Sequence, residues 1–376
     1  MSFSHFLNAA FGTSWGWRFV RVFVYISLGS VLWQLRPVPA SQRALKPINR
    51  GTRRNNIPRY AFVTAVVVAV TGLAGATAYG VTQNTDKASA LASPVYVDPG
   101  PPYLGVFEPT EQASYKTVDN FGTITGHQPQ VVLYYSSWDQ PFATQFAETA
   151  HAAHATPLVD LLPQGHGVSV ESIAKGQSDS YLRSYADQVR QYRYPVIMGF
   201  APEMNGNWYS WGLGHAQPAQ YVAAWRHVVD VFRAQGATNV TWLWAVAETT
   251  PSQPDVSAWW PGNNYVTWAG VDGYFYHSTD TFDSVFGTAL SEVRALTNKP
   301  VFIPETSAGP SVNQAAQIKS LFRGIQQNGL IGMVWFDQRQ NDGLYHLNWH
   351  IEGDKPALAA FHWGINFLKK SMNKSL

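Results

Sequence analysis

Short runs of apolar residues recur along the chain from about residue 100 onward, and stretches with helical periodicity separate them. The runs are rich in β-branched and aromatic residues, as expected for strands. They predict strands at 103–107, 131–136, 157–162, 195–200, 239–245, 269–274, 300–304 and 331–336. The stretches between them predict helices at 139–154, 178–193, 217–235, 281–297 and 312–328, with a closing helix at 356–370.

This alternation of strands and helices is typical of parallel βαβ units. Eight such units in residues 100–376 match the size of a closed barrel, so we predict an α/β domain with the (β/α)8 TIM-barrel fold. Reactive residues of such barrels lie at the carboxyl ends of the strands. Chemically capable side chains directly after each apolar run are therefore candidates for an active site.

An uncharged apolar stretch precedes this domain at residues 60–82. At ~1.5 Å per residue, a helix of that length crosses the ~30 Å hydrocarbon core of a bilayer. The region 1–59 is basic close to this stretch. The positive-inside rule therefore predicts a single-pass protein of the cell membrane, with 1–59 in the cytoplasm and a linker at 83–99 leading to an extracytoplasmic barrel.

Two other features of the N-terminal region bear on this topology. The stretch from Phe19 to Leu35 is apolar but short and interrupted by Arg21, and we interpret it as an interfacial helix rather than a second span. Ala76-Thr77-Ala78 resembles a cleavage signal, which leaves release from the membrane open. The long region before the span favours an uncleaved anchor.

Composition narrows the class of ligand. A net charge of +2 is too small for the electrostatic footprint of a nucleic-acid-binding protein, so we predict no nucleic-acid partner. Aromatic residues make up 14% of the chain, including 15 Trp, and flat rings pack well against the C–H faces of sugars. An aromatic-rich core accounts for the same composition. The absence of Cys excludes disulfides and Cys-zinc sites.

Two glutamates stand at the ends of predicted strands in apolar surroundings. Glu203 follows the run 195–200 and precedes an aromatic, nearly uncharged segment, and Glu305 follows the run 300–304. A retaining glycosidase needs one carboxylic acid and one nucleophilic carboxylate about 5–5.5 Å apart. Apolar surroundings keep the acid protonated. We predict Glu203 as acid/base and Glu305 as nucleophile, a mechanism that needs no metal or organic cofactor.

Other acidic residues compete for these roles. Glu248, after the run 239–245, is the main rival, either as a substrate contact or as an exposed loop residue, and we favour the latter. We interpret Asp139, Asp272 and Asp337 as structural. For either glutamate alone, a helix cap or an ion pair with Arg is the favoured explanation, but both together at strand ends beside Trp favour catalysis.

These residues lie within a recognisable set of motifs. The segment FAPEMNGNWYSWG (200–212) resembles the signature of glycoside hydrolase family 26. Supporting blocks follow the family's order, among them LGVFEP (104–109), WWPGNNYVTWAGVDGY (259–274), KPVFIPETSAG (299–309) and VWFD (334–337). The resemblance covers residues 103–337.

The resemblance implies a TIM barrel, a retaining mechanism and endo-β-mannanase-like glycosidase activity. It implies that Trp208 lines the sugar site, that Tyr274 supports the nucleophile and that Trp335 is a sugar-stacking platform. Ordinary core packing is the alternative explanation for Trp208 and Trp335. From the same blocks and strand ends we add Trp138, Asn205 and Trp211 as candidate substrate-binding residues.

One departure from the family pattern concerns the reacting sugar. The family has His before the acid/base, whereas this chain has Pro202, which lacks a polar side-chain group and an N–H. Either another residue takes over that contact or hydroxyl recognition is altered. This weakens the prediction of mannan as the substrate in particular.

The prediction is a hydrolase that cleaves a β-linked polysaccharide, β-mannan-like or related, at the cell surface. Two alternatives stay open on the same barrel. One is a non-catalytic glycan-binding module. The other is an accessory protein of polysaccharide synthesis or export, which would need a membrane partner.

Overall fold

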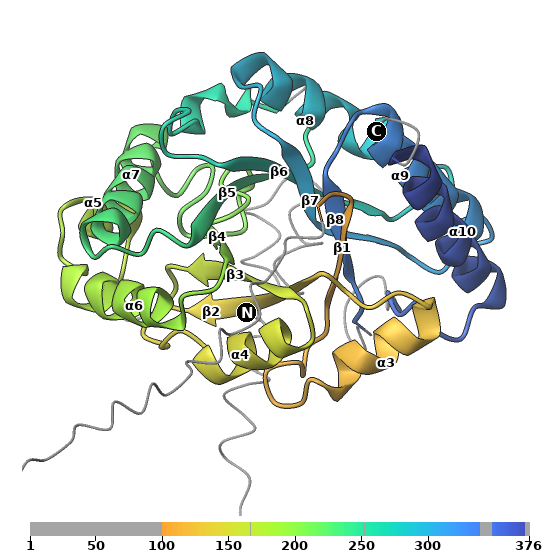
Figure 1. The fold of residues 1–376 in the computed structure, drawn as a ribbon. Coiled ribbons are helices and arrows are strands. Elements are labelled where there is room, and N and C mark those ends of the chain that lie inside the picture. The colour runs from red at the N-terminus through yellow and green to blue at the C-terminus, as the bar shows by residue number, and fades with distance from the viewer. Residues whose placement is uncertain (1–99, 166, 251–252, 339–347, 373–376) are drawn as a thin grey trace, which may run out of the picture. The chain divides into compact units, whose positions relative to one another are not determined.

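The computed structural model describes residues 100–165, 167–250, 253–338 and 348–372. These residues form a closed barrel of eight parallel strands in sequential order, with helices around its outside (Figure 1). The predicted (β/α)8 barrel is therefore confirmed. The strands are β1 Tyr103–Phe107, β2 Val131–Ser137, β3 Thr156–Leu162, β4 Val196–Phe200, β5 Val240–Ala247, β6 Trp268–Phe275, β7 Val301–Ala308 and β8 Gly332–Phe336.

Each predicted strand corresponds to one observed strand, and the bounds differ by a few residues. The largest difference is at β7, which continues past Glu305 to Ala308. The apolar pattern ends at Pro304, so the polar residues that follow concealed the rest of the strand. Glu305 thus lies within β7 rather than at its end.

The helices are α3 Lys116–Thr125, α4 Thr144–Ala152, α5 Val170–Ala174, α6 Asp179–Tyr192, α7 Pro218–Ala234, α8 Phe282–Leu296, α9 Gln314–Gln327 and α10 Lys355–Met372, with a 3-10 turn η1 at Val256–Trp259. The sequence did not predict α3 or α5. The 10 residues that form α3 include three Thr and one Gly, which are weak helix formers. The helix α5 has only 5 residues, too few to give a periodic pattern.

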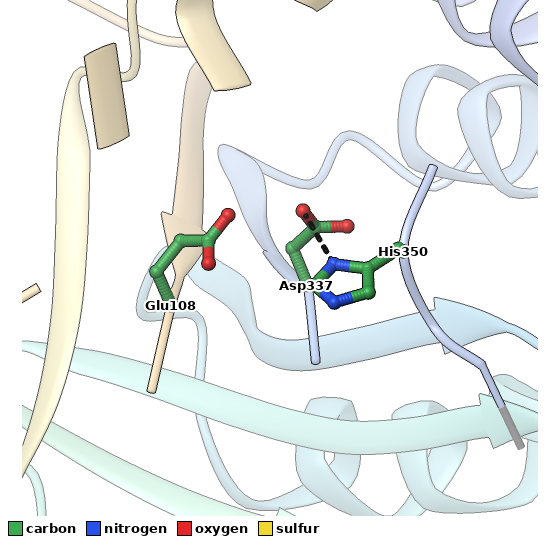
Figure 2. Close-up of side chains that lie close together, drawn as sticks. All are labelled: Glu108, Asp337 and His350. Carbon is green, nitrogen blue, oxygen red and sulfur yellow. Dashed lines mark hydrogen bonds and ion pairs between the residues drawn. The ribbon is translucent and has the colours of Figure 1, made fainter. Parts of the chain in front are cut away.

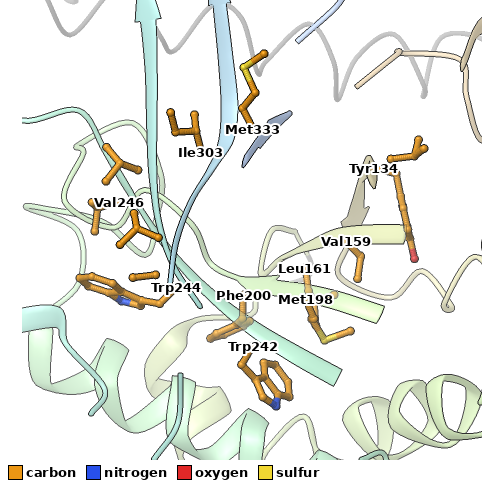
Figure 3. Packing of buried hydrophobic residues seen from close by; sticks show 14 of the residues in the cluster. Tyr134, Val159, Leu161, Met198, Phe200, Trp242, Trp244, Val246, Ile303 and Met333 are labelled. Atoms are coloured by element: carbon orange, nitrogen blue, oxygen red, sulfur yellow. The ribbon is translucent and has the colours of Figure 1, made fainter. Parts of the chain in front are cut away.

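Two hydrophobic clusters build the domain. The outer cluster fills the space between strands and helices and includes Phe200, Trp242 and Trp244 (Figure 3). The inner cluster fills the barrel itself and includes Phe107, Leu133 and Phe336. Because successive residues of a strand point to opposite faces, neighbours in sequence enter different clusters. This alternation decides which aromatic residues can approach the mouth of the barrel.

The predicted N-terminal segments 1–59, 60–82 and 83–99, and the apolar stretch 19–35, lie outside the described residues. Among the residues that the structure describes, no helix is both long enough and apolar enough to cross a membrane.

Candidate active site

Glu203 lies in the loop after β4, on an unusual backbone. Its φ is 54° and that of Ala201 is 47°, a left-handed region that side chains other than Gly rarely occupy. The loop is fixed from two sides, because Glu203 N donates to Ala245 O at 3.0 Å and the Trp211 indole N–H donates to Pro202 O at 2.8 Å. Strained backbone that the surroundings hold in place is often found at reaction centres.

Glu305 enters the mouth from β7 at an irregularity in the sheet. The pairing of β7 with β8 shifts register between Ile303 and Thr306, and the pairing with β6 shifts between Gly270 and Gly273. Such irregularities re-aim side chains next to active sites. Only 3% of Glu305 is exposed.

Two tyrosine hydroxyls hold the Glu305 carboxylate. Tyr274 of β6 donates to Oε2 at 2.8 Å, and Tyr135 of β2 donates to Oε1. Both carboxylate oxygens are thus engaged by donors. Donors of this kind stabilise a carboxylate in its ionised form.

Glu203 has one such donor. The Trp208 indole N–H donates to Glu203 Oε2 at 2.8 Å, and 4% of Glu203 is exposed. Trp208 is itself half-buried, so one part of its ring reaches the surface beside the carboxyl group. The structure therefore brings Trp208 and Tyr274 into contact with the two candidate catalytic carboxyls.

The electrostatics differ between the two glutamates. Burial raises the pKa of Glu203 well above its usual value, and the charge of Glu305 raises it further, against the opposing Trp208 hydrogen bond. Burial also raises the pKa of Glu305, but the hydrogen bonds from Tyr135 and Tyr274 lower it. The pKa of both glutamates is therefore raised, but that of Glu203 lies well above its usual value while two hydrogen bonds limit the rise at Glu305. This difference favours a protonated Glu203 beside an ionised Glu305.

Two further acids lie inside the barrel below this pair. Asp160 of β3 and Asp272 of β6 are buried, and the Oδ1 atom of each has no hydrogen-bond partner. Burial, followed by the charge of Glu305, raises the pKa of both well above the usual value. Gly199 of β4 makes room for Asp160, because a Cβ there would overlap Asp160 Oδ1.

Three predicted substrate-binding tryptophans lie in the outer cluster instead. Trp335 is 0% exposed, its ring lies 5.2 Å from that of Phe361 in α10, and its indole N–H donates to Trp349 O. The prediction of Trp335 as a sugar-stacking platform is therefore wrong for this conformation, since β8 turns that residue outward. Trp211 is fully buried and Trp138 packs against Tyr181, so both support the loops around the site.

Asn205 also has a structural position. Its side-chain amide donates to Ala247 O and its side-chain oxygen accepts from Ala247 N, each at 2.9 Å. Both polar ends of the side chain therefore bind the end of β5. We correct the predicted substrate contact at Asn205 to a link between the Glu203 loop and β5.

Glu248 is half-buried, whereas the sequence favours an exposed loop residue at this position. Its Oε2 accepts from Tyr274 N at 3.3 Å, and burial raises its pKa to about 8. Asp139, the first acid after β2, is exposed with a φ of 77°.

A second group of polar side chains lies at the ends of β1 and β8. Glu108, Asp337 and His350 offer ligand-type atoms within 4.8 Å of one another. Figure 2 shows these three side chains. His350 Nδ1 lies 3.2 Å from Asp337 Oδ2, and Ile351 N donates to Asp337 Oδ1 at 2.9 Å. Burial raises the pKa of Glu108 to about 9, and the neighbouring Asp337 adds to this rise through its charge and a hydrogen bond. At neutral pH the Glu108 carboxyl is therefore protonated beside the Asp337 side chain.

Sequence reasoning did not assign roles to Tyr135, Asp160 or Glu108. Tyr135 lies two residues after Leu133 of the inner cluster, so strand alternation alone pointed it inward. Asp160 is a charged residue within an apolar strand, and Glu108 directly follows one. Each of these positions could have identified the residue from the sequence as a candidate for the site.

Comparisons with known proteins bear on this arrangement. Residues 166–323 match the family model of glycosyl hydrolase family 26. This part of the barrel is therefore similar to family 26 glycosyl hydrolases.

Curated relatives agree with that match. Endoglucanase H of Acetivibrio thermocellus is 28% identical over 271 residues, which cover 68% of this chain and 29% of that protein. A β-1,3-xylanase from a Vibrio species is 31% identical over 177 residues, covering 45% of this chain and 36% of that protein. The matched part thus spans about a third of each relative. The barrel is similar to glycosidases.

Solved structures resemble the fold. An endo-β-1,4-mannanase from Cellulomonas fimi gives a TM-score of 0.54 at 17% identity, covering 65% of each chain. A family 26 β-mannanase from Bacteroides ovatus gives a TM-score of 0.55 at 16% identity, covering 71% of this chain and 88% of that one. At these identities the similarity concerns the fold.

Proposed function

We propose that this protein is a retaining glycoside hydrolase that cleaves a β-linked polysaccharide with Glu203 and Glu305. The observation that carries the proposal is the contrast between the two carboxyls. Glu305 accepts hydrogen bonds from two tyrosines, whereas Glu203 is buried beside the negative charge of Glu305. This contrast supports an ionised nucleophile facing a protonated acid.

The chemistry follows in two steps. Glu305 attacks the anomeric carbon, the glycosidic bond breaks, and Glu203 gives its proton to the departing oxygen. Glu203, now ionised, takes a proton from water, whose oxygen attacks the anomeric carbon and releases Glu305. Both Glu203 and Glu305 return to their starting protonation states, and the anomeric configuration is retained.

The tyrosines have a defined part in these steps. Tyr135 and Tyr274 stabilise the negative charge of Glu305 before attack and hold its oxygens in place. Their hydrogen bonds weaken when Glu305 becomes an ester, and they recover when water releases the sugar. This recovery of charge favours the second step.

The relatives narrow the range of glycans to test. Their names refer to an endoglucanase, a β-1,3-xylanase and a β-1,4-mannanase. We therefore propose β-mannan, β-1,3-xylan and β-glucan as candidate substrates. The absence of a polar side chain at Pro202 leaves β-glucan and β-1,3-xylan as strong alternatives to mannan.

The experiment is a polysaccharide screen with the purified full-length chain. Product masses identify the glycan, and NMR of the first products reports their anomeric configuration. We expect retention with one of the three polymers, and loss of turnover in Glu203→Gln and Glu305→Gln variants that stay folded. Inverted products, or activity in both variants, would remove the proposal. Binding without any release of reducing ends would favour the glycan-binding module.

We also propose that residues 60–82 anchor the protein in the cell membrane with the barrel outside, on the strength of the uncharged stretch and the basic residues before it. Membrane fractionation and protease treatment of intact cells test this. Barrel fragments should be released by protease from the surface of intact cells, and an intact, protected barrel would contradict it.

A further inference from the structure

Two strands carry aromatic residues that surround the candidate nucleophile. Phe107 of β1 and Phe336 of β8 pair in register, and their rings stack at 4.6 Å. The Phe107 ring lies 5.1 Å from Tyr135, and the Phe336 ring lies 5.7 Å from Tyr274. These are the tyrosines that bind Glu305, so the pair of phenylalanines is part of its surroundings.

Glu108 and Asp337 are the next residues of the same two strands. Asp337 N donates to Phe107 O at 2.9 Å, which continues the pairing of β1 and β8 beyond the phenylalanines. Both side chains are buried, and Figure 2 shows their carboxyl groups facing each other. They lie at the carboxyl ends of β1 and β8, one position further toward the mouth than the phenylalanines.

The charged groups around Glu108 are acidic. Burial is the largest cause of the raised pKa of Glu108, and the charges of Asp337, Glu352 and Glu111 raise it further. Among the described residues no Lys or Arg forms an ion pair with any of these acids, and His350 is the basic group beside Asp337 and Glu352, at 3.2 and 3.7 Å. Glu108 therefore keeps its proton at neutral pH and can donate it to a neighbouring oxygen such as that of Asp337. The pair presents a hydroxyl donor and carboxylate acceptors together.

Two side chains close to this pair in the chain have a buried oxygen without a hydrogen-bond partner among the described residues. Glu111 is 3% exposed, its Oε2 atom has no such partner, and burial raises its pKa to about 8, so its carboxyl group is protonated at neutral pH. Gln338, which directly follows Asp337, has a buried Oε1 atom without a partner. Buried polar atoms of this kind are rare in folded proteins and call for a hydrogen-bond partner. A ligand rich in hydroxyl groups supplies one.

We propose that Glu108 and Asp337 form a hydroxyl-binding subsite for a sugar unit next to the reacting one. The inference rests on the proposed function and adds a specificity determinant to it. A sugar hydroxyl both donates and accepts, as does a carboxyl pair of which one member is protonated. The half-buried Tyr276, whose ring lies 5.7 Å from Trp349, adds aromatic surface on the same side as Tyr274.

The test measures binding apart from turnover. In the full-length chain carrying Glu203→Gln, titration calorimetry measures affinity for mannotetraose, 1,3-xylotetraose and a mixed-linkage glucan tetrasaccharide. We expect Glu108→Ala to weaken affinity for the best probe about tenfold, the cost of one hydrogen bond. Glu108→Gln should stay within about threefold at pH 7, because an amide can donate to Asp337 as the protonated acid does. The matched control is Glu148→Gln, on the exposed face of α4.

The pH dependence separates a binding role from a structural one. With Glu108 intact, affinity should fall as pH rises through about 9, because Glu108 loses its proton. The Glu108→Gln variant should keep its affinity over that range. Circular dichroism confirms that each variant stays folded.

Three outcomes overturn the inference. The inference is wrong if the Glu108→Ala variant binds the probe as tightly as the chain with Glu108 intact. It is also wrong if the affinity of the Glu108→Gln variant falls with pH to the same extent as that of the chain with Glu108 intact. Loss of affinity with EDTA and its return with Ca²⁺ or Mn²⁺ would overturn the inference and indicate a cation site instead. Failure of the proposed function gives a different result. In that case the wild-type chain binds a probe in a way that depends on Glu108 but releases no product from it.

Discussion

The Tyr135 hydroxyl donates a hydrogen bond to Oε1 of Glu305 although the two residues are 170 positions apart in the chain. Tyr274 binds the other oxygen from β6. A strand on each side of the mouth thus contributes to one carboxylate. The barrel brings them together because all eight strands end at the same rim.

The first prediction concerns these tyrosines. Tyr135→Phe and Tyr274→Phe should each lower kcat/KM about 10–100-fold, since a hydrogen bond to a charged group contributes about 1.5–3 kcal/mol. Because both bonds lower the pKa of Glu305, their loss should move the acidic limb of the pH profile to higher pH. Tyr265→Phe, on the outside of the barrel, is the control. An unmoved acidic limb in both variants would contradict the assigned role of these bonds.

The second prediction concerns Trp208. Its hydrogen bond lowers the pKa of Glu203, so Trp208→Phe should raise that pKa and move the alkaline limb of kcat/KM to higher pH. Activity should fall at least about tenfold as the acid loses its orienting partner. The control is Trp363→Phe in α10. The pH dependence of kcat/KM measures the shift, and a shift of the alkaline limb toward lower pH would contradict the role assigned to this hydrogen bond.

The third prediction concerns Gly199. A Cβ there would overlap the Asp160 carboxyl, so Gly199→Ala should destabilise the barrel by about 1–3 kcal/mol. In Gly287→Ala the new Cβ would meet nothing closer than 3.9 Å, and α8 should gain about 0.5–1 kcal/mol. Urea unfolding measures both. Equal stabilities for the two variants would argue against close packing at Asp160.

The fourth prediction concerns Asp160 and pH. Its pKa is raised in the folded state, so its contribution to stability is complete below the unfolded pKa, about 3.9, and is lost as pH rises toward the folded value. Asp160→Asn does not ionise and should therefore be more stable than the wild type at neutral pH, with a gap that widens as pH rises. Thermal unfolding at several pH values checks this against the exposed control Asp230→Asn. A gap independent of pH would contradict it.

The sequence predicted all eight strands because each is a short apolar run between helical stretches. It also placed Glu203 and Glu305 at the mouth, since both follow such runs. The extension of β7 to Ala308 was hidden by the polar residues Glu305, Thr306 and Ser307, which are buried in the structure.

The tryptophans were harder to place for a physical reason. Trp335 and Phe336 are neighbours on β8, but alternation sends Phe336 into the barrel and Trp335 toward α10. Composition shows that both residues are aromatic but does not indicate which face of the strand each occupies. Counting positions from Val334, an inner residue, would have given the correct face.

The roles of Asn205 and Glu248 depended on partners that are distant in sequence. Asn205 binds Ala247, 42 positions away, and Glu248 accepts from Tyr274, 26 positions away. Local patterns carry no information about such pairs. Only the closed barrel brings them into contact.

The most direct test of the two-glutamate mechanism is covalent trapping of the nucleophile. A 2-deoxy-2-fluoro glycoside of the sugar identified in the screen slows the second step, and peptide mass spectrometry then locates the attached sugar. We predict one sugar per chain, attached to Glu305, and no labelling in the Glu305→Gln variant. A label on another residue, or turnover of the glycan with no covalent adduct at all, would contradict the account.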